Sequence, residues 1–242
     1  MNRKIYFNGR EIIYTLTPKK IKNINLRIKP DGRVVASCPM NTDYSEVDRF
    51  VRENGQKILK FQEKNLNIKN SYSISSEFAY GEPFYISGEK KTICIKQSQS
   101  YGAYILNDWL IIEAPDALNI EKKKASVEVL LTEICRNEIE VALNKFKCFF
   151  NNENVKTIPH ITYRKMKSRW GSCLPSKSRL SINKLLACAP RQCIEYVLIH
   201  ELSHLVYPDH SKCFYALVSK YVPNYKSIKQ ELSQYGVILS DF

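Results

Sequence analysis

The chain has 242 residues, of which 44% are hydrophobic and 25% charged, a composition typical of a globular protein with one large or two small domains. No apolar stretch approaches the roughly 20 residues that span a bilayer, and the first ten residues lack the apolar core of a secretory signal. We therefore expect a cytoplasmic protein without a membrane association. The eight scattered cysteines are expected to be reduced thiols.

The formal net charge of +13 is compatible with nucleic acid or another anionic partner. The basic residues are spread along the chain, however, and only short runs such as Pro18-Lys19-Lys20 and Lys122-Lys123-Lys124 interrupt that spread. This distribution favours a solvated, lysine-rich surface and leaves a nucleic-acid role open.

The first half reads as hairpins around one helix. Ile24, Leu26 and Ile28 alternate with polar residues, as in a half-buried strand. The turn residues 30–32 follow, and residues 33–36 return as the partner strand.

A single helix is expected over residues 43–64, with Gly55 as a weak point, and the polar residues 65–77 read as a linker. Residues 84–95 form a second hairpin candidate and residues 109–112 a further strand. No internal repeat is evident, although the two hairpins are loosely alike.

From about residue 121 the apolar residues recur at helical spacing. The domain boundary is placed just before this helix. Residues 1–118 form a hairpin-rich N-terminal region with one helix, and residues 119–242 form a second domain. The expected fold class is α+β.

The chemistry is concentrated in one short window. Of the four histidines in the chain, His200, His204 and His210 lie within eleven residues, and Glu201 follows the first of them. On a helix His200 and His204 lie one turn apart on the same face, while Glu201 flanks them. Pro208 is expected to end the helix so that the chain can turn His210 back toward the other two. Three imidazoles and a free position for water are typical of a catalytic zinc site.

Two non-catalytic alternatives remain. One is a buried helix whose histidines are satisfied by hydrogen bonds, and the other is a structural zinc site completed by Cys213. The pattern favours one catalytic zinc ion, with His200, His204 and His210 as ligands and Glu201 as the general base toward an attacking water. Asp209 is either an orienting partner for a ligand or an exposed turn residue.

The developing oxyanion needs a further donor. Arg164, Arg169, Tyr207 and Tyr215 are the candidates that the sequence offers, and it does not choose among them.

Further segments flank this window. They are residues 166–173, which include Trp170-Gly171-Ser172-Cys173, then Leu180-Ser181-Ile182-Asn183, and Phe214 after the last histidine. Together with the window from His200 to His210, these segments resemble the YgjP-like family of metallopeptidase domains, whose wider relatives are the SprT-like and WLM-type zincins. The resemblance is strongest over residues 160–222 and extends into the N-terminal half.

The resemblance implies a β-rich N-terminal half followed by a zincin-like catalytic domain that contains the His-Glu-x-x-His helix. It also implies strands near residues 169–183, with Trp170 and Asn183 lining the substrate cleft. For Trp170 a packed position beneath the helix is an equally open interpretation. Cys173 is expected to be packed rather than nucleophilic.

The leading hypothesis is thus a zinc metallopeptidase acting on peptide or protein. A metal-dependent nucleotide phosphohydrolase of the pyrophosphatase type is the alternative within enzymes, because the same chemistry can attack phosphorus, although no phosphate-binding motif is present. A nucleic-acid-associated module is the alternative from another class.

Overall fold

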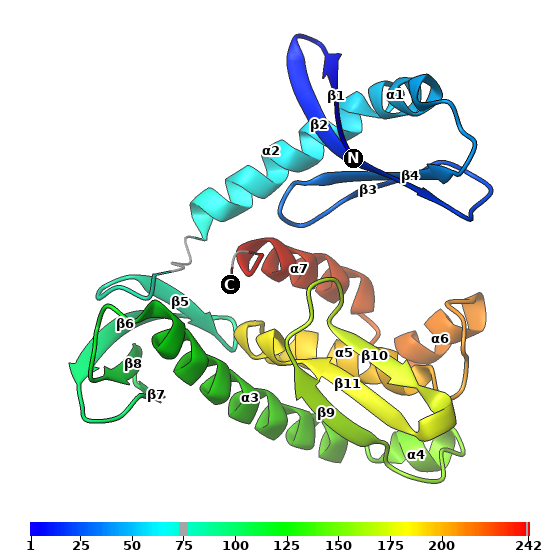
Figure 1. Ribbon diagram of the computed structural model, residues 1–242. Helices are drawn as coiled ribbons and strands as arrows, with labels where there is room; N and C mark the ends of the chain where they lie inside the picture. Colours follow the sequence, from blue (N-terminus) through cyan, green and yellow to red (C-terminus); the bar gives the residue numbers. More distant parts are fainter. Residues whose placement is uncertain (73–76, 241) are drawn as a thin grey trace. The chain divides into compact units, whose positions relative to one another are not determined.

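The computed structural model describes residues 1–72, 77–240 and 242 and has a mixed α+β architecture (Figure 1). The strands are β1 (Asn2–Phe7), β2 (Arg10–Lys19), β3 (Asn25–Ile28), β4 (Val34–Pro39), β5 (Pro83–Ile86), β6 (Glu89–Gln97), β7 (Gly102–Leu106), β8 (Trp109–Ala114), β9 (His160–Arg164), β10 (Gly171–Leu174) and β11 (Arg179–Asn183). The α-helices are α1 (Tyr44–Glu53), α2 (Gly55–Ser71), α3 (Ile120–Lys145), α4 (Cys148–Asn152), α5 (Arg191–Ser203), α6 (Lys212–Tyr221) and α7 (Tyr225–Ile238). Two 3-10 helices, η1 (Pro175–Lys177) and η2 (Lys184–Cys188), complete the list.

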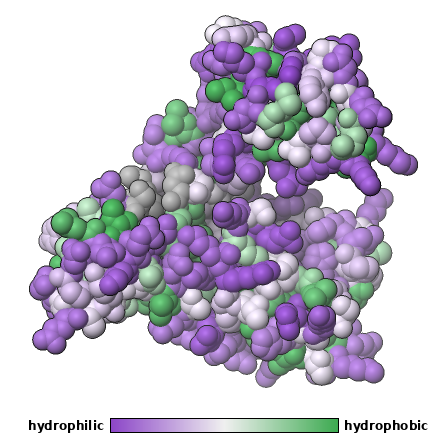
Figure 2. All heavy atoms as spheres, viewed as in Figure 1, coloured by the Kyte–Doolittle hydropathy of each residue, from purple (hydrophilic) through white to green (hydrophobic). Residues whose placement is uncertain are grey.

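None of the helices in the described ranges is long and apolar enough to cross a membrane. The face drawn in Figure 2 is mostly hydrophilic, and apolar side chains appear on it in small patches. Such scattered apolar exposure is usual for a folded chain.

The described residues divide into two compact units, and the first comprises residues 1–72 with residues 236–240. Its four-stranded sheet has the order β1-β2-β4-β3. The sheet and the helices α1 and α2 share a buried apolar core that includes Ile12, Tyr14, Val34, Val47 and Ile58. The hairpin predicted around residues 24–36 is confirmed, because β3 pairs antiparallel with β4.

The helix predicted over residues 43–64 is instead two helices. Helix α1 ends at Glu53 with Asn54 as its cap, and α2 begins at Gly55. A Cβ at Gly55 would lie 2.4 Å from the ring of Phe7, so only glycine allows strand β1 and the helix to approach this closely. Helix α2 continues to Ser71, into the predicted linker; residues 73–76 of that linker lie outside the described residues.

The second unit comprises residues 77–235 with residue 242. It contains a four-stranded sheet of order β5-β6-β8-β7 and a three-stranded sheet of order β10-β11-β9. The long helix α3 packs against β7 and β8 and also against η2 and α5. The predicted boundary between residues 118 and 119 falls inside this unit, because α3 joins the sheet that precedes it to the helix that follows.

The two four-stranded sheets share one topology, although the sequence shows no evident repeat. In each sheet the first strand pairs antiparallel with the second, the second parallel with the fourth, and the third antiparallel with the fourth. The first hairpin turns also correspond. Asn8 and Gly9 have φ values of 49° and 74°, and Ser87 and Gly88 have values of 54° and 83°. These paired left-handed residues are typical of two-residue hairpin turns.

The segments after the two sheets also correspond. A proline ends the fourth strand or follows it directly, and four residues later comes the helix cap, Asp43 after Pro39 and Asn119 after Pro115. Both cap side chains accept a hydrogen bond from a backbone N–H of the first helical turn. The chain therefore contains two structural copies of one β-β-β-β-helix arrangement.

Among the described residues, the first turn of the second copy supports a later element, and we find no such contact at the first turn of the first copy. The backbone N–H groups of Ser87 and Gly88 donate to the carbonyls of Ala187 (2.8 Å) and Cys188 (3.0 Å) in η2. A Cβ at Gly88 would lie 2.6 Å from Cγ and 3.2 Å from Cα of Pro190, the cap of α5, whereas a Cβ at Gly9 would meet nothing within 4 Å. The turn at Gly88 thus fixes the start of α5.

This difference gives a matched pair of substitutions. Both Gly9→Ala and Gly88→Ala carry the strain of a left-handed residue, roughly 1 kcal/mol. Gly88→Ala must also displace Pro190, and we expect it to cost a further 1–3 kcal/mol or so, as overpacking usually does. Urea denaturation followed by circular dichroism measures both losses. Equal losses for the two variants would show that the turn at Gly88 does not support α5.

Candidate metal centre

Helix α5 is buried on nearly every side. Pro190 precedes its first residue, and its carbonyl accepts a hydrogen bond from the backbone of Cys193 at 2.8 Å. Ile194, Leu198 and Leu202 are fully buried. Apolar packing, rather than side-chain pairs on an exposed face, therefore stabilises the helix. The helix ends at Ser203, five residues before Pro208, in a succession of tight turns.

The three predicted imidazoles come together at the end of this helix. His200, His204 and His210 each offer a ring nitrogen, and these nitrogens all lie within 4.8 Å of one another. The Nε2 atoms of His200 and His210 are 3.1 Å apart. Two ligands about 2.1 Å from one tetrahedral ion would be roughly 3.4 Å apart. The imidazole cluster therefore has the dimensions of a shared coordination shell.

His210 reaches the cluster because a second helix starts directly behind it. Ser211 is the cap of α6 and accepts a hydrogen bond from the backbone N–H of Phe214. The Phe214 ring is fully buried, and its centroid lies 4.9, 4.6 and 4.8 Å from those of His200, His204 and His210. One aromatic ring is thus the common packing partner of all three imidazoles and restricts their rotation.

One hydrogen bond sets the orientation of His204. Its Nδ1 lies 3.2 Å from the carbonyl oxygen of Tyr207, so Nδ1 carries the proton and Nε2 keeps its lone pair. This is the backbone contact that ligand histidines commonly make. Asp209, which the sequence offered as a possible orienting partner, is exposed. The carbonyl of Tyr207 orients His204 instead.

The surroundings of His200 and His204 favour the neutral form of their imidazoles. Burial, together with the neighbouring His204 and His210, lowers the pKa of His200 to about 3. Burial also lowers the pKa of His204. Neutral imidazoles are the form in which histidine binds a metal ion.

Glu201 lies beside the cluster with its carboxylate enclosed. The residue is 5% exposed, and its Oε2 is buried without a hydrogen-bond partner, as is Nδ1 of His200. Burial raises the pKa of Glu201 to about 7, and the charge of Arg169 opposes that rise. An unpaired buried carboxylate is costly unless a cation compensates it. The orphaned carboxylate oxygen and the three converging ring nitrogens fit the needs of a divalent metal ion.

Strand β10 forms the wall against Glu201. A Cβ at Gly171 would lie 2.5 Å from Oε1 and 2.8 Å from Cδ of Glu201. The strand can pass this close to the carboxylate only because residue 171 has no side chain. Gly171 was not among the predicted site residues, although it belongs to the Trp170-Gly171-Ser172-Cys173 segment on which the resemblance rests.

The other predicted substrate or oxyanion residues lie at different distances from the cluster. Arg169 is exposed, and its charge acts on Glu201. Trp170 is half-buried, directly before β10. Tyr207 contributes its carbonyl to His204, and the Tyr215 ring lies 6.0 Å from that of His210. Arg164 ends β9, the strand at the opposite edge of the sheet from β10, which separates it from Gly171 by roughly 10 Å of sheet.

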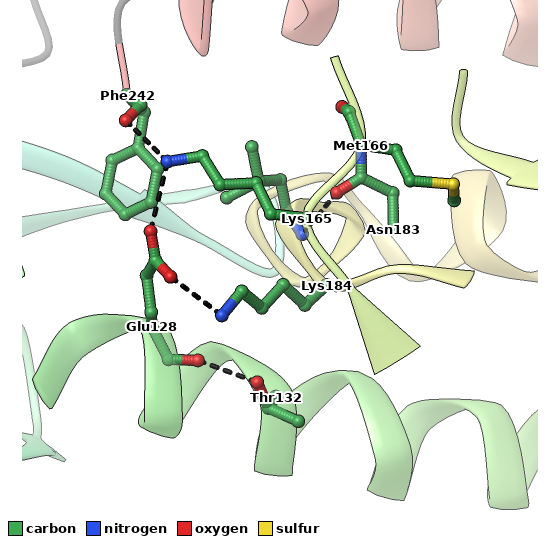
Figure 3. A network of polar contacts seen from close by, with 8 residues as sticks. Glu128, Thr132, Lys165, Met166, Asn183, Lys184 and Phe242 are labelled. Carbon is green, nitrogen blue, oxygen red and sulfur yellow. Dashed lines mark hydrogen bonds and ion pairs between the residues drawn. The ribbon is translucent and has the colours of Figure 1, made fainter. Parts of the chain in front are cut away.

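Asn183 is a correction to the expectation of a cleft residue. It is 3% exposed. Its side-chain amide donates to the carbonyl of Met166 at 2.8 Å (Figure 3). The same amide donates to the carbonyl of Arg169 at 3.1 Å, and the side-chain oxygen accepts from the backbone of Leu185. With both ends of the amide engaged, Asn183 holds the loop before β10.

Two cysteines lie close to the cluster in sequence or in space, Cys173 and Cys213. Burial raises the pKa of the Cys173 thiol to about 11, and the neighbouring Glu201 adds to the rise, so the thiol stays protonated, as expected of a packed residue. Cys213 is exposed and lies outside the group of three histidines that the described residues bring together.

Comparison with known proteins places this geometry in a family. Residues 22–235 match the YgjP-like metallopeptidase domain. No curated protein matches the chain. Among solved structures, the metallopeptidase zymogen abylysin of Pyrococcus abyssi is similar at 20% identity and a TM-score of 0.34, over 40% of this chain and 90% of that one. The zymogen jannalysin of Methanocaldococcus jannaschii is similar at 18% identity and a TM-score of 0.34, over 41% and 94%.

The family match spans most of the chain, and it includes the imidazole cluster, Glu201 and the β10 wall. The metallopeptidase domain implies a metal ion and a hydrolytic reaction. The chain belongs to the YgjP-like family of metallopeptidase-domain hydrolases.

Proposed function

We propose that the protein is a zinc-dependent metallopeptidase with a zincin-like catalytic unit. In this proposal His200, His204 and His210 hold one zinc ion, and Glu201 is the general base. The observation that carries it is the convergence of three imidazole ring nitrogens within 4.8 Å, next to a buried carboxylate oxygen without a partner. A structural zinc site would use a fourth protein ligand, and the group in the described residues has three.

The bound zinc ion would act as a Lewis acid that polarises the scissile carbonyl and acidifies water. Glu201 accepts a proton from the attacking water and returns it to the leaving amine. A general base works best when its pKa is near the working pH, and burial places the pKa of Glu201 at about 7. Arg169 approaches the site from the loop before β10 and offers a positive charge to the developing oxyanion.

The proposed substrate is an extended peptide. Strand β10 pairs with β11 along one side only, and in the described sheet it is an edge strand. An exposed edge can accept a peptide as an additional strand through backbone hydrogen bonds. A peptide bound there would pass Gly171, which touches the Glu201 carboxylate, so its scissile bond would lie near the general base.

The first test is metal content together with hydrolysis. Wild-type protein and His204→Ala are purified, reconstituted with zinc and analysed by atomic absorption, and both are then assayed on casein and on nucleoside triphosphates. We expect about one zinc per wild-type chain, loss of the metal in His204→Ala, and casein cleavage only by the wild type. A wild-type chain that binds no zinc would refute the metal site. Zinc-dependent turnover of triphosphates alone would refute the peptidase assignment.

A further inference from the structure

A carboxylate outside the metal centre bridges two lysines in the second unit. Glu128 on α3 lies with its Oε1 3.0 Å from Nζ of Lys165 and its Oε2 2.8 Å from Nζ of Lys184 (Figure 3). The side chains of Glu128 and Lys184 are only 23% and 17% exposed. Partly desolvated, charge-assisted contacts of this kind are stronger than surface ion pairs.

The state of the carboxylate agrees with this arrangement. Burial alone would raise the pKa of Glu128, but the hydrogen bonds from Lys184 and Lys165 outweigh it, and the pKa is lowered. Glu128 therefore stays ionised, and each of its oxygens holds a different lysine.

The two lysines bracket the segment that faces the general base. Lys165 lies directly before Met166, and Lys184 directly after Asn183. Between them run the loop with Arg169, strand β10 with Gly171, and β11. One carboxylate on a long helix thus holds both ends of this segment.

Further contacts tighten the same segment. Lys165 also donates to the carbonyl oxygen of Phe242 at 2.8 Å, and its ammonium lies 4.8 Å from the centre of the Phe242 ring. Asn183, next to Lys184, binds the carbonyls of Met166 and Arg169 through its side chain, and its backbone N–H donates to Trp170 at 2.8 Å. The contacts at these two ends therefore help to fix the position of the loop.

We infer that Glu128 is a positioning residue for the proposed peptidase reaction: it clamps Lys165 and Lys184 and thereby keeps Arg169 and Gly171 in register with Glu201. This inference rests on the proposed function for its effect on turnover. The clamp itself is a property of the segment and can be measured without any activity.

The test uses the full chain with Trp109→Phe, which leaves Trp170 as the single tryptophan and makes it a reporter inside the clamped segment. Glu128→Gln keeps the shape of the side chain and removes its charge. Glu133→Gln, at an exposed position on the same helix, is the matched control. For Glu128→Gln we expect acrylamide to quench Trp170 at least about twofold more efficiently. We also expect kcat for peptide to fall about tenfold, in line with a small misplacement of catalytic groups, with zinc content and KM nearly unchanged.

Quenching and kcat that match those of Glu133→Gln, measured below the melting temperature, would overturn the inference. If Glu128→Gln does not fold, Lys165→Met removes one arm of the clamp and must show the same two changes at smaller size, or the inference falls. If the zinc-loaded wild type cleaves no peptide, the proposed function has failed, and the quenching of Trp170 still decides whether the clamp exists.

Discussion

Replacing Glu201 by glutamine should lower the kcat for peptide hydrolysis by about 10²–10⁴-fold, the usual worth of a general base. The change removes the proton acceptor but preserves the size of the side chain and the imidazole cluster. We expect zinc content, measured by atomic absorption, to equal that of the wild type. A variant that retains zinc and more than about a tenth of the wild-type kcat would exclude Glu201 as the general base.

The same variant should reveal how much the buried carboxylate lowers the free energy of unfolding of the metal-free protein. The folded pKa of about 7 lies above the ordinary value of 4.5 because of burial. A raised carboxyl pKa contributes stability that is complete below the unfolded pKa and is lost as the pH rises through the folded pKa. Relative to Glu201→Gln, the chelator-treated wild type should therefore lose about 3 kcal/mol between pH 4.5 and pH 7.

Urea denaturation of both metal-free proteins at several pH values measures this difference. The comparison cancels the titration of other groups, such as His200, that the two proteins share. With zinc bound, the wild type should become more stable than Glu201→Gln, because the cation compensates the charge of the carboxylate. A stability difference that does not change with pH would show that the carboxylate is solvated in the folded state.

The second large effect is expected at Gly171. Gly171→Ala would place a methyl group 2.5 Å from Oε1 of Glu201, so the carboxylate must move away from its position. A displacement of about 1 Å at a catalytic group can cost about 100-fold in rate. The imidazoles are not touched, so we expect kcat to fall by about this factor while zinc binding is retained. Steady-state kinetics and zinc titration measure the two quantities.

Gly102→Ala is the control for this substitution. It also replaces a strand glycine, and its new Cβ would meet only the Glu113 side chain, at an ordinary 3.5 Å. The control should keep wild-type kinetics. Equal losses in both variants would point to a general effect of alanine in a strand and would contradict a specific contact between residue 171 and Glu201.

The sequence predicted well the parts of the site that local geometry determines. His200, Glu201 and His204 are placed by the pitch of one helix, and His210 follows after a short turn, so their proximity needs only the helix period. The hairpin at residues 24–36 could be predicted for the same reason, since alternation and a turn signal are both local.

Contacts between distant segments could not be predicted in this way. Nothing near Gly171 in the sequence reveals that it touches Glu201, thirty residues later. Asn183 was expected in the cleft from the resemblance, and its buried bonds to the loop carbonyls could not be foreseen because they are non-local. Strands β1 and β2 were missed although Asn8-Gly9 is a strong hairpin signal. In β2 the exposed Ile13, which is 61% accessible, interrupts the alternation of apolar and polar residues.

The shared strand order of the two four-stranded sheets creates a hazard during folding, because β2 could pair with β8 and β6 with β4. Tandem copies of one arrangement are prone to such misassembly. The two cores are packed differently, however. Tyr14 and Ile93 lie five residues after their turn glycines, Ala36 and Ile112 lie three residues before their prolines, and all four are buried. In the native registers Leu16 lies opposite Ala36, and Ile95 lies opposite Ile112. A hybrid of β2 with β8 would therefore crowd Leu16 against Ile112, and the reciprocal hybrid would leave a void where Ile95 faces Ala36. Divergent side-chain volumes are therefore expected to direct each strand to its own sheet.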